Sequence, residues 1–226
     1  MFDLYGFGAQ LLQGAAVTLE VAGLSLLFGV VLGILGAAAK LSTLRWLRSG
    51  VTLLVNLIRG VPEFLILLIV YFSLPQILSS LTGADIAISP LVGGVFALSI
   101  VFGAYASETF RGGFMAVPRG QLEAARAFGM PRTRVFSRIH LPQAWRYALP
   151  GLSNLWQTLL KDTSLVSVLG LEEIMRKADI AAQVTKRPFN FYVAAALIYL
   201  AFILLSGPAF AWLERRANRG LARAPS

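Results

Sequence analysis

The sequence contains no cysteine and a single histidine, His140, among its 226 residues. The lack of cysteine excludes disulfides, thiolate chemistry and the zinc or iron–sulfur sites that need cysteine ligands. His140 has no neighbouring residues suited to metal binding or general-base chemistry, so we expect it to lie in a loop. The sequence therefore predicts no catalytic residue and no metal site.

Charged residues are also scarce. They make up 14% of the chain, whereas 57% is hydrophobic and the mean hydropathy is +0.71. Few soluble domains have such a composition. The net charge of +9 comes from basic residues that collect between apolar runs, which does not indicate a nucleic-acid partner. Lipid is therefore the expected environment of the chain.

Long apolar runs account for most of the sequence. A helix of about 20 apolar residues crosses a bilayer, and such windows predict an all-α membrane protein with five transmembrane helices. These are Leu11 to Ala39, Val51 to Leu78, Pro90 to Phe110, Gln143 to Gly170 and Phe189 to Leu213. Because no repeat and no soluble domain is visible, we expect one membrane domain over residues 1–226.

The distribution of lysine and arginine predicts the orientation, because basic loops stay on the cytoplasmic side. Fourteen basic residues fall in the first loop, in the segment from Arg111 to Arg146 and in the C-terminal tail, and only four fall in connections on the other side. The N-terminus should therefore lie outside and the C-terminus inside. No basic residue precedes Lys40, so the first span lacks the start of a cleavable signal peptide and should be retained.

The long inner loop contains signals for two short helices. Residues 121–128 are rich in helix formers, Gly129 is suited to a left-handed cap, and Pro131 can begin a second helix that ends at Leu141-Pro142. This arrangement is compatible with a knob that docks into a partner protein. It is equally compatible with an interfacial connector whose arginines bind anionic lipid.

Several motifs resemble a known family. Glu123-Ala124-Ala125, Gly129 and Ile139-His140-Leu141-Pro142 resemble the EAA loop of ATP-binding-cassette (ABC) importer permeases. Segments spread over most of the chain are similar to the polar amino-acid branch, which serves histidine, lysine, arginine and ornithine: Ile58-Arg59-Gly60-Val61-Pro62, Gly103-Ala104-Tyr105 and Arg146-Tyr147-Ala148-Leu149-Pro150-Gly151. The resemblance implies a type I ABC importer permease fold in the bacterial inner membrane.

The resemblance also implies partners. Two permeases, two ATPase subunits and a periplasmic binding protein would work together, with a sister permease expected rather than a second copy of this chain. The chain has no Walker A motif, so ATP and Mg²⁺ are expected in the ATPase. A coupling loop over about residues 117–142 would dock into the ATPase through Glu123, Ala124, Ala125, Phe128, Gly129, Leu141 and Pro142.

Charged residues inside the predicted spans are candidates for substrate contact, because burying charge in a membrane is costly. The run from Arg59 to Glu63 includes Gly60 and Pro62, which favour a broken helix of the kind that forms solute sites. The alternative is a kinked helix in which Arg59 and Glu63 pair with each other.

A second candidate segment lies in the fourth predicted span. Lys161-Asp162-Thr163-Ser164-Leu165 resembles the Lys-X-Thr-Ser-Leu segment of the family. A carboxylate there could bind an ammonium or guanidinium group, whereas the alternative for Asp162 is an ion pair with Lys161. We expect substrate contacts from Asp162, Glu63, Arg59, Gly60 and Ser164. Glu108 should instead brace Arg111 or the loop.

The sequence thus predicts a permease subunit, not an enzyme, of an ABC importer for cationic L-amino acids or related opines, working by alternating access. A membrane scaffold that recruits a cytoplasmic protein and an ion-coupled carrier are the rival hypotheses. Several points stay open: the exact cargo, the pairing with itself or a sister, the subunit that holds the cargo, and the binding protein.

Overall fold

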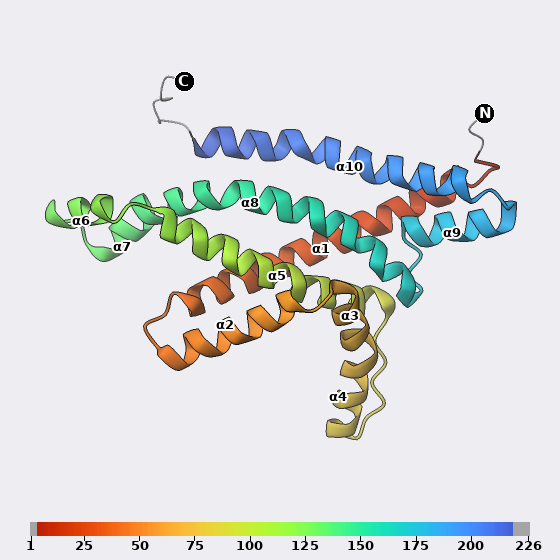
Figure 1. The fold of residues 1–226 in the computed structure, drawn as a ribbon, viewed down its shortest axis with the longest axis horizontal. Coiled ribbons are helices and arrows are strands. Elements are labelled where there is room, and N and C mark those ends of the chain that lie inside the picture. Colours follow the sequence, from red (N-terminus) through yellow and green to blue (C-terminus); the bar gives the residue numbers. More distant parts are fainter. Residues whose placement is uncertain (1–3, 219–226) are drawn as a thin grey trace.

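The computed structural model describes residues 4–218, and all regular secondary structure in this part of the chain is helical. Four long helices run along the long axis: α1 (Gly8–Lys40), α5 (Pro90–Ala116), α8 (Leu141–Asp162) and α10 (Pro188–Ala217). The short helices α6 (Arg119–Ala127) and α7 (Arg132–Val135) lie at one end with the end of α10 (Figure 1). Helix α9 (Ile174–Thr185) and the start of α1 lie at the other end.

Helices α1 and α5 approach each other closely because α1 presents glycine where they meet. Gly29, Gly33 and Gly36 lie three or four residues apart and so share one face of the helix. Small residues of this kind allow membrane helices to pack backbone against backbone. A Cβ added at these positions would approach side-chain atoms of Phe102, Ala106 and Ser107 to 2.6, 2.7 and 2.8 Å, respectively.

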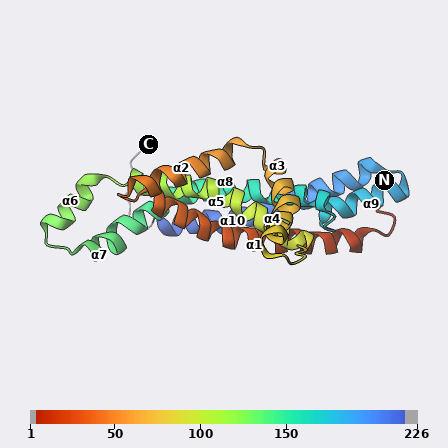
Figure 2. The same ribbon diagram turned by 90° about the horizontal axis from the view of Figure 1, so that it is seen from below.

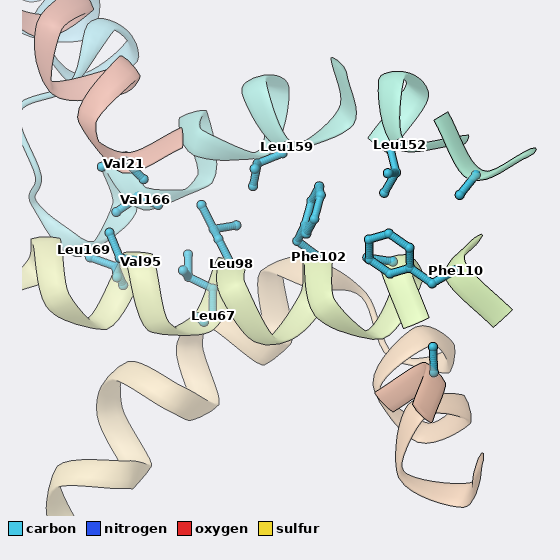
Figure 3. Packing of buried hydrophobic residues seen from close by; sticks show 14 residues of the cluster. Val21, Leu67, Val95, Leu98, Phe102, Phe110, Leu152, Leu159, Val166 and Leu169 are labelled. Atoms are coloured by element: carbon cyan, nitrogen blue, oxygen red, sulfur yellow. The ribbon is translucent and has the colours of Figure 1, made fainter. Parts of the chain in front are cut away.

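The main hydrophobic core lies where α5 meets α8 and α1. Leu98, Phe102 and Phe110 of α5 point toward Leu152 and Leu159 of α8 in Figure 3, and all five are buried. A second, smaller core at the other end joins α1, α9 and α10 through Leu11, Ile174 and Phe191 among others. The two cores together fix the long helices against one another.

The predicted span from Val51 to Leu78 is not one continuous helix, and of the two alternatives for the Arg59 to Glu63 segment the broken helix is the one that forms. The chain forms α2 (Arg45–Gly60), breaks, and continues as α3 (Glu63–Leu68), a π-helical turn over Ile69–Ser73 and α4 (Leu74–Thr82). Pro62 causes the break, since the residue before a proline avoids the helical region, and Val61 is extended with φ −106° and ψ 137°. The arm formed by α3 and α4 projects from the bundle in Figure 1 and is seen end-on, in front of the long helices, in Figure 2.

Among residues 4–218, four helical segments are long and apolar enough to cross a membrane: Gly8–Lys40, Glu63–Thr82, Pro90–Ala116 and Pro188–Ala217. The first, third and last predicted spans are thus confirmed as such helices. The fourth predicted span is helical, as α8 followed by a 3-10 helix over Thr163–Leu169, but it does not belong to this set. The chain is a multi-pass membrane protein, but the predicted count of five transmembrane helices is not confirmed.

Candidate functional site: a polar centre on Tyr105 and a helical tip

The polar centre of the bundle is organised by Tyr105 on α5. The Tyr105 hydroxyl donates a hydrogen bond of 3.1 Å to Oε1 of Glu63, the first residue of α3. The Arg59 guanidinium, in the last turn of α2, lies 5.2 Å from the centroid of the Tyr105 ring. One aromatic side chain therefore joins the two sides of the helix break at Pro62.

Asp162 reaches the same centre from the end of α8. Together with Tyr105 and Thr158 it lines a recess of about 10 Å³, which holds about one water molecule at most. Within residues 4–218, Asp162 makes no hydrogen bond and no ion pair, although the Glu63 carboxylate is near enough to repel it. In this conformation the centre is closed around two carboxylates.

The structure brings together three of the five residues predicted to contact substrate, namely Arg59, Glu63 and Asp162. Gly60 is exposed at the end of α2, where a Cβ would meet no atom within 4 Å. The Ser164 hydroxyl donates to the Lys161 carbonyl oxygen at 2.7 Å, and Ser164 is not among the residues that line the recess. Ser164 therefore lies outside the recess, although it is only two residues from Asp162 in the sequence.

The two local ion pairs considered from sequence are not formed. Arg59 and Glu63 are separated by the extended Val61, so they do not share a helical turn. Arg59 instead lies 3.9 Å from Oε1 of Glu108. Lys161 and Asp162 are adjacent on α8 and make no ion pair, since neighbouring helical residues point in different directions.

Glu108 on α5 is the neighbouring charge centre. Its Oε1 pairs with Lys40, whose side chain is 2% exposed, and its Oε2 lies 2.8 Å from Nη2 of Arg111. The pairing with Arg111 was predicted and is confirmed. Because Arg59 also contacts Glu108, this carboxylate links the ends of α1 and α2 to α5 beside the Tyr105 centre.

The predicted pair of helices in the long loop is confirmed in outline. Helix α6 ends near Gly129, which has φ +80°, and the Met130 N–H donates to the Ala125 carbonyl at 3.1 Å. This left-handed ending requires glycine because other side chains are strained there. Phe128 is 90% exposed next to this turn. The helical tip, formed by α6, α7 and the turn between them, therefore carries a large apolar side chain.

The tip is linked to the bundle and presents most of the predicted loop residues. Glu123 and Ala124 are exposed on α6, whereas Ala125 is buried. Gln143 of α8 donates from Nε2 to Oε1 of Gln121 at 2.6 Å. The helical tip is therefore supported by α8 while its outer face stays open.

Leu141-Pro142 does not end the second helix of the loop, so that prediction is wrong. Helix α7 continues through a π-helical turn over Phe136–His140 directly into α8, where Pro142 occupies the first turn. A π-helical turn changes the hydrogen-bond register and thereby accommodates the missing N–H of proline. His140 is consequently helical rather than in a loop, and its Nε2 lies 3.1 Å from the Phe114 carbonyl oxygen.

Glu173, which lies between the 3-10 helix and α9, was not predicted as a functional or structural centre from the sequence. This carboxylate is completely buried, and its Oε1 accepts the Arg176 N–H at 2.9 Å, which caps α9. Its Oε2 accepts hydrogen bonds from Thr18 of α1 at 3.3 Å and from Tyr199 of α10 at 2.7 Å. No sequence signal separated Glu173 from its exposed neighbour Glu172.

Tyr105 was also missed as a site residue. The segment Gly103-Ala104-Tyr105 carried part of the family resemblance, but its spacing did not show that the tyrosine contacts Arg59 and Glu63. The signal available in the sequence was a hydroxyl-bearing aromatic residue three positions before Glu108 in an apolar span. Such a residue usually finds a polar partner when buried.

Comparison with known proteins identifies the family. Residues 29–219 match the model of the binding-protein-dependent transport system inner membrane component. The chain is 45% identical to the histidine/lysine/arginine/ornithine transport system permease protein HisQ of Escherichia coli (strain K12), covering 98% of this chain and 99% of HisQ. It is 46% identical to the nopaline transport system permease protein NocQ of Agrobacterium fabrum, covering 96% and 94%.

A solved structure shows the same architecture. The structure of an amino acid ABC transporter with histidines aligns with a TM-score of 0.82 at 33% identity, covering 92% of this chain and 94% of that chain. The relatives are transport subunits rather than enzymes. The chain therefore belongs to the family of inner membrane components of binding-protein-dependent transport systems, as a permease subunit of an ABC importer.

Proposed function

We propose that this permease subunit carries cationic L-amino acids, such as arginine, ornithine, lysine or histidine, or opines derived from them. The observation that carries the proposal is the pair of carboxylates next to Tyr105: Glu63 accepts its hydrogen bond, and Asp162 lines the same recess as Tyr105. The relatives named for histidine, lysine, arginine, ornithine and nopaline support the same cargo class. The scaffold hypothesis leaves these intramembrane carboxylates without a role and is not favoured.

The chemistry of the centre suits a guanidinium or ammonium group. Asp162 lacks a hydrogen-bond partner in the described part of the chain, so its carboxylate can accept a charge-assisted bond from the cargo. The Tyr105 ring already carries the Arg59 guanidinium on its face, and a cargo cation can be held there in the same way. The recess must open first, which is consistent with alternating access.

Arg59, Gly60 and Ser164 complete the proposed substrate set. Arg59 is positioned to receive the carboxylate that every amino-acid cargo carries, since guanidinium groups bind carboxylates through two parallel hydrogen bonds. Gly60 leaves open space beside Arg59, so a cargo backbone can approach. Ser164 would contribute only after its hydroxyl leaves the Lys161 carbonyl.

The helical tip is proposed to dock into a partner ATPase, which would bind ATP and Mg²⁺. Phe128 and the exposed face of α6 supply an apolar contact with a polar rim, and the direct continuation of α7 into α8 gives a stiff path to the Tyr105 centre. The docking set is Glu123, Ala124, Ala125, Phe128, Gly129, Leu141 and Pro142.

The proposed assembly sits in the bacterial inner membrane. It adds a sister permease, giving a heterodimer, and a periplasmic binding protein. The tip and the end of α10 share one end of the bundle, while α9 and the start of α1 lie at the other (Figure 1). Together with the basic residues of the loop and tail, this supports a cytoplasmic tip and C-terminus and an external N-terminus.

The cargo assignment is tested with Asp162→Asn, using Glu172→Gln as a matched control on an exposed carboxylate outside the centre. Uptake of arginine and of a neutral amino acid is measured in vesicles containing the complete importer. Arginine uptake should fall about tenfold, because a charged hydrogen bond contributes about 1.5–3 kcal/mol. An equal loss for both amino acids would contradict cation recognition, and the control should retain uptake.

The docking assignment is tested with Gly129→Asp, using Gly120→Asp as the matched control. Gly129 has φ +80°, whereas Gly120 is an exposed helical residue with no strain and no neighbour within 4 Å. Only the change at Gly129 should reduce co-purification of the ATPase and uptake together. If Gly129→Asp leaves both intact, the tip does not couple the ATPase to transport.

A further inference from the structure

Helix α2 has three distinct faces, and one of them is polar although the helix lies beside two apolar spans. Six polar or basic side chains recur every three or four residues and therefore share one face. We call this face the polar stripe of α2, and it consists of Arg45, Arg48, Ser49, Thr52, Asn56 and Arg59.

The other two faces of α2 are apolar. The packed face, which includes Val51, Val55 and Ile58, is turned toward α1 and α5 and lines a cavity of about 190 Å³ together with Gly36 and Gly103. The third face exposes large hydrophobic side chains: Trp46 is 74% exposed, Leu53 is 62% exposed and Leu57 is 58% exposed. Lipid is the natural solvent for this third face.

The hydrocarbon of lipid is a poor solvent for the polar stripe. An arginine at the centre of a bilayer costs about 2.5 kcal/mol or more, and an amide or hydroxyl without a partner also costs free energy there. Arg48 and Asn56 are exposed, and together with Ser49, Thr52 and the neighbouring Leu53 they line an open surface groove of about 430 Å³. Four of the five lining side chains are polar, so the stripe is suited to water or another polar surface.

The polar stripe is continuous with the proposed cargo site. Its last member, Arg59, lies on the Tyr105 ring, which in turn hydrogen-bonds Glu63. Its first member, Arg45, begins α2 at the end of the helix that faces the helical tip (Figure 1). The stripe thus runs from the Tyr105 centre toward the end of the bundle that carries α6 and α7.

We propose that the polar stripe of α2 is the wall of the inner exit route, along which hydrated cargo leaves the Tyr105 centre when the importer opens inward. This proposal rests on the proposed function and deepens it. The stripe carries hydroxyls, an amide and arginines but no carboxylate. A cationic cargo meets no opposite charge after leaving Glu63 and Asp162, so it is released rather than retained. The sister permease closes the route from the opposite side.

Single cysteines test the proposal without background from this chain, which has no cysteine of its own, and the labelling is read on the band of this subunit. Asn56→Cys and Thr52→Cys place a thiol on the stripe, and Leu57→Cys places one at the same depth on the lipid face. Each variant is assembled into the full importer in inside-out vesicles and treated with a membrane-impermeant thiol reagent. Ser49→Cys, which exchanges only oxygen for sulfur, serves if a larger change prevents folding.

The stripe thiols should react about tenfold faster than the thiol at position 57, because the reactive thiolate forms only in water. Arginine cargo should slow the reaction at position 56. Equal rates at positions 52, 56 and 57 in both the resting and the ATP-trapped importer would overturn the proposal, as would reaction only from the outer side. Uptake is measured in parallel so that the two proposals can be told apart. Loss of selectivity for cationic amino acids, with the stripe thiols still reactive, counts against the cargo assignment. Normal uptake with unreactive stripe thiols counts against the exit route.

Discussion

Glu108 and Glu173 both join three parts of the bundle, but they do so with different partners. Glu108 lies on α5 and receives the positive charges of Lys40, Arg111 and Arg59, with its side chain 21% exposed. Glu173 is completely buried, and the side chains that bind it are the neutral hydroxyls of Thr18 and Tyr199. The first is a hub of charges, and the second is a hydrogen-bonded clamp.

The difference indicates which end of the bundle can rearrange. Arg59 is partly exposed and, at 3.9 Å, the most distant of the three cations, so its ion pair with Glu108 can be exchanged at little cost, unlike that of the buried Lys40. The contacts of Glu173 depend instead on close packing, since a Cβ at Gly14 would lie 2.9 Å from the Glu173 carbonyl carbon. We therefore expect α2 to move relative to α5 during transport, while α9 stays fixed to α1 and α10.

The largest expected effect is that of Glu108→Gln. The change leaves the Lys40 ammonium, whose side chain is 2% exposed, without its counter-ion, and breaking such a buried pair costs about 3 kcal/mol. The apparent melting temperature of the purified importer should fall clearly. Adding Lys40→Met should restore much of the loss, because the uncompensated charge is then removed. No recovery in the double variant would show that Glu108 acts through its other partners.

The next effect is that of Glu173→Ala. It leaves two hydroxyls and the Arg176 N–H without their acceptor, at a cost of about 2 kcal/mol in the free energy of unfolding. Glu173→Gln is the matched control, since its amide oxygen can accept the Arg176 N–H while its NH₂ group donates to the Tyr199 hydroxyl, and its cost should be smaller than that of the alanine. Equal losses in the two variants would mean that the negative charge, which both remove, and not the hydrogen bonding holds the clamp together.

The smallest effect is the contribution of Glu173 to the pH dependence of stability. Burial raises the pKa of the Glu173 carboxyl above its ordinary value, although the hydrogen bonds to it oppose the rise. The folded state therefore holds the proton more tightly than the unfolded state. Its contribution to stability is present below the ordinary carboxyl pKa and is lost as the pH rises through the raised pKa. Lowering the pH should thus stabilise the wild type relative to Glu173→Gln, and parallel melting curves across pH would contradict this.

Local patterns were enough to predict several parts of the fold. Gly129 was expected to take a left-handed conformation because it follows a run of helix formers, and it does. The apolar runs containing Leu11, Pro90 and Phe189 predicted three of the long helices. These features depend on neighbouring residues, and so they can be found in sequence. The break at Pro62 was anticipated, but the direction of the arm after it was not.

Contacts between residues far apart in the sequence could not be predicted from local patterns. Tyr105 and Glu63 are 42 residues apart, and Thr18 and Glu173 are 155 apart. Glu173 therefore looked like an exposed charge, and Tyr105 looked like part of an apolar span. Likewise, Pro142 was expected to end a helix because a π-helical turn in the preceding residues cannot be read from the sequence.

The sequence by itself determined three things: that this protein is a membrane protein, the positions of its basic segments, and the family that it resembles. Hydropathy, charge and short motifs are properties of neighbouring residues. Only the tertiary structure decided that Arg59, Glu63 and Asp162 meet at one tyrosine, and that the polar side chains of α2 form a continuous stripe leading from it. The packing of α1, α2, α5 and α8 sets those distances, and it arises from contacts made across the whole chain.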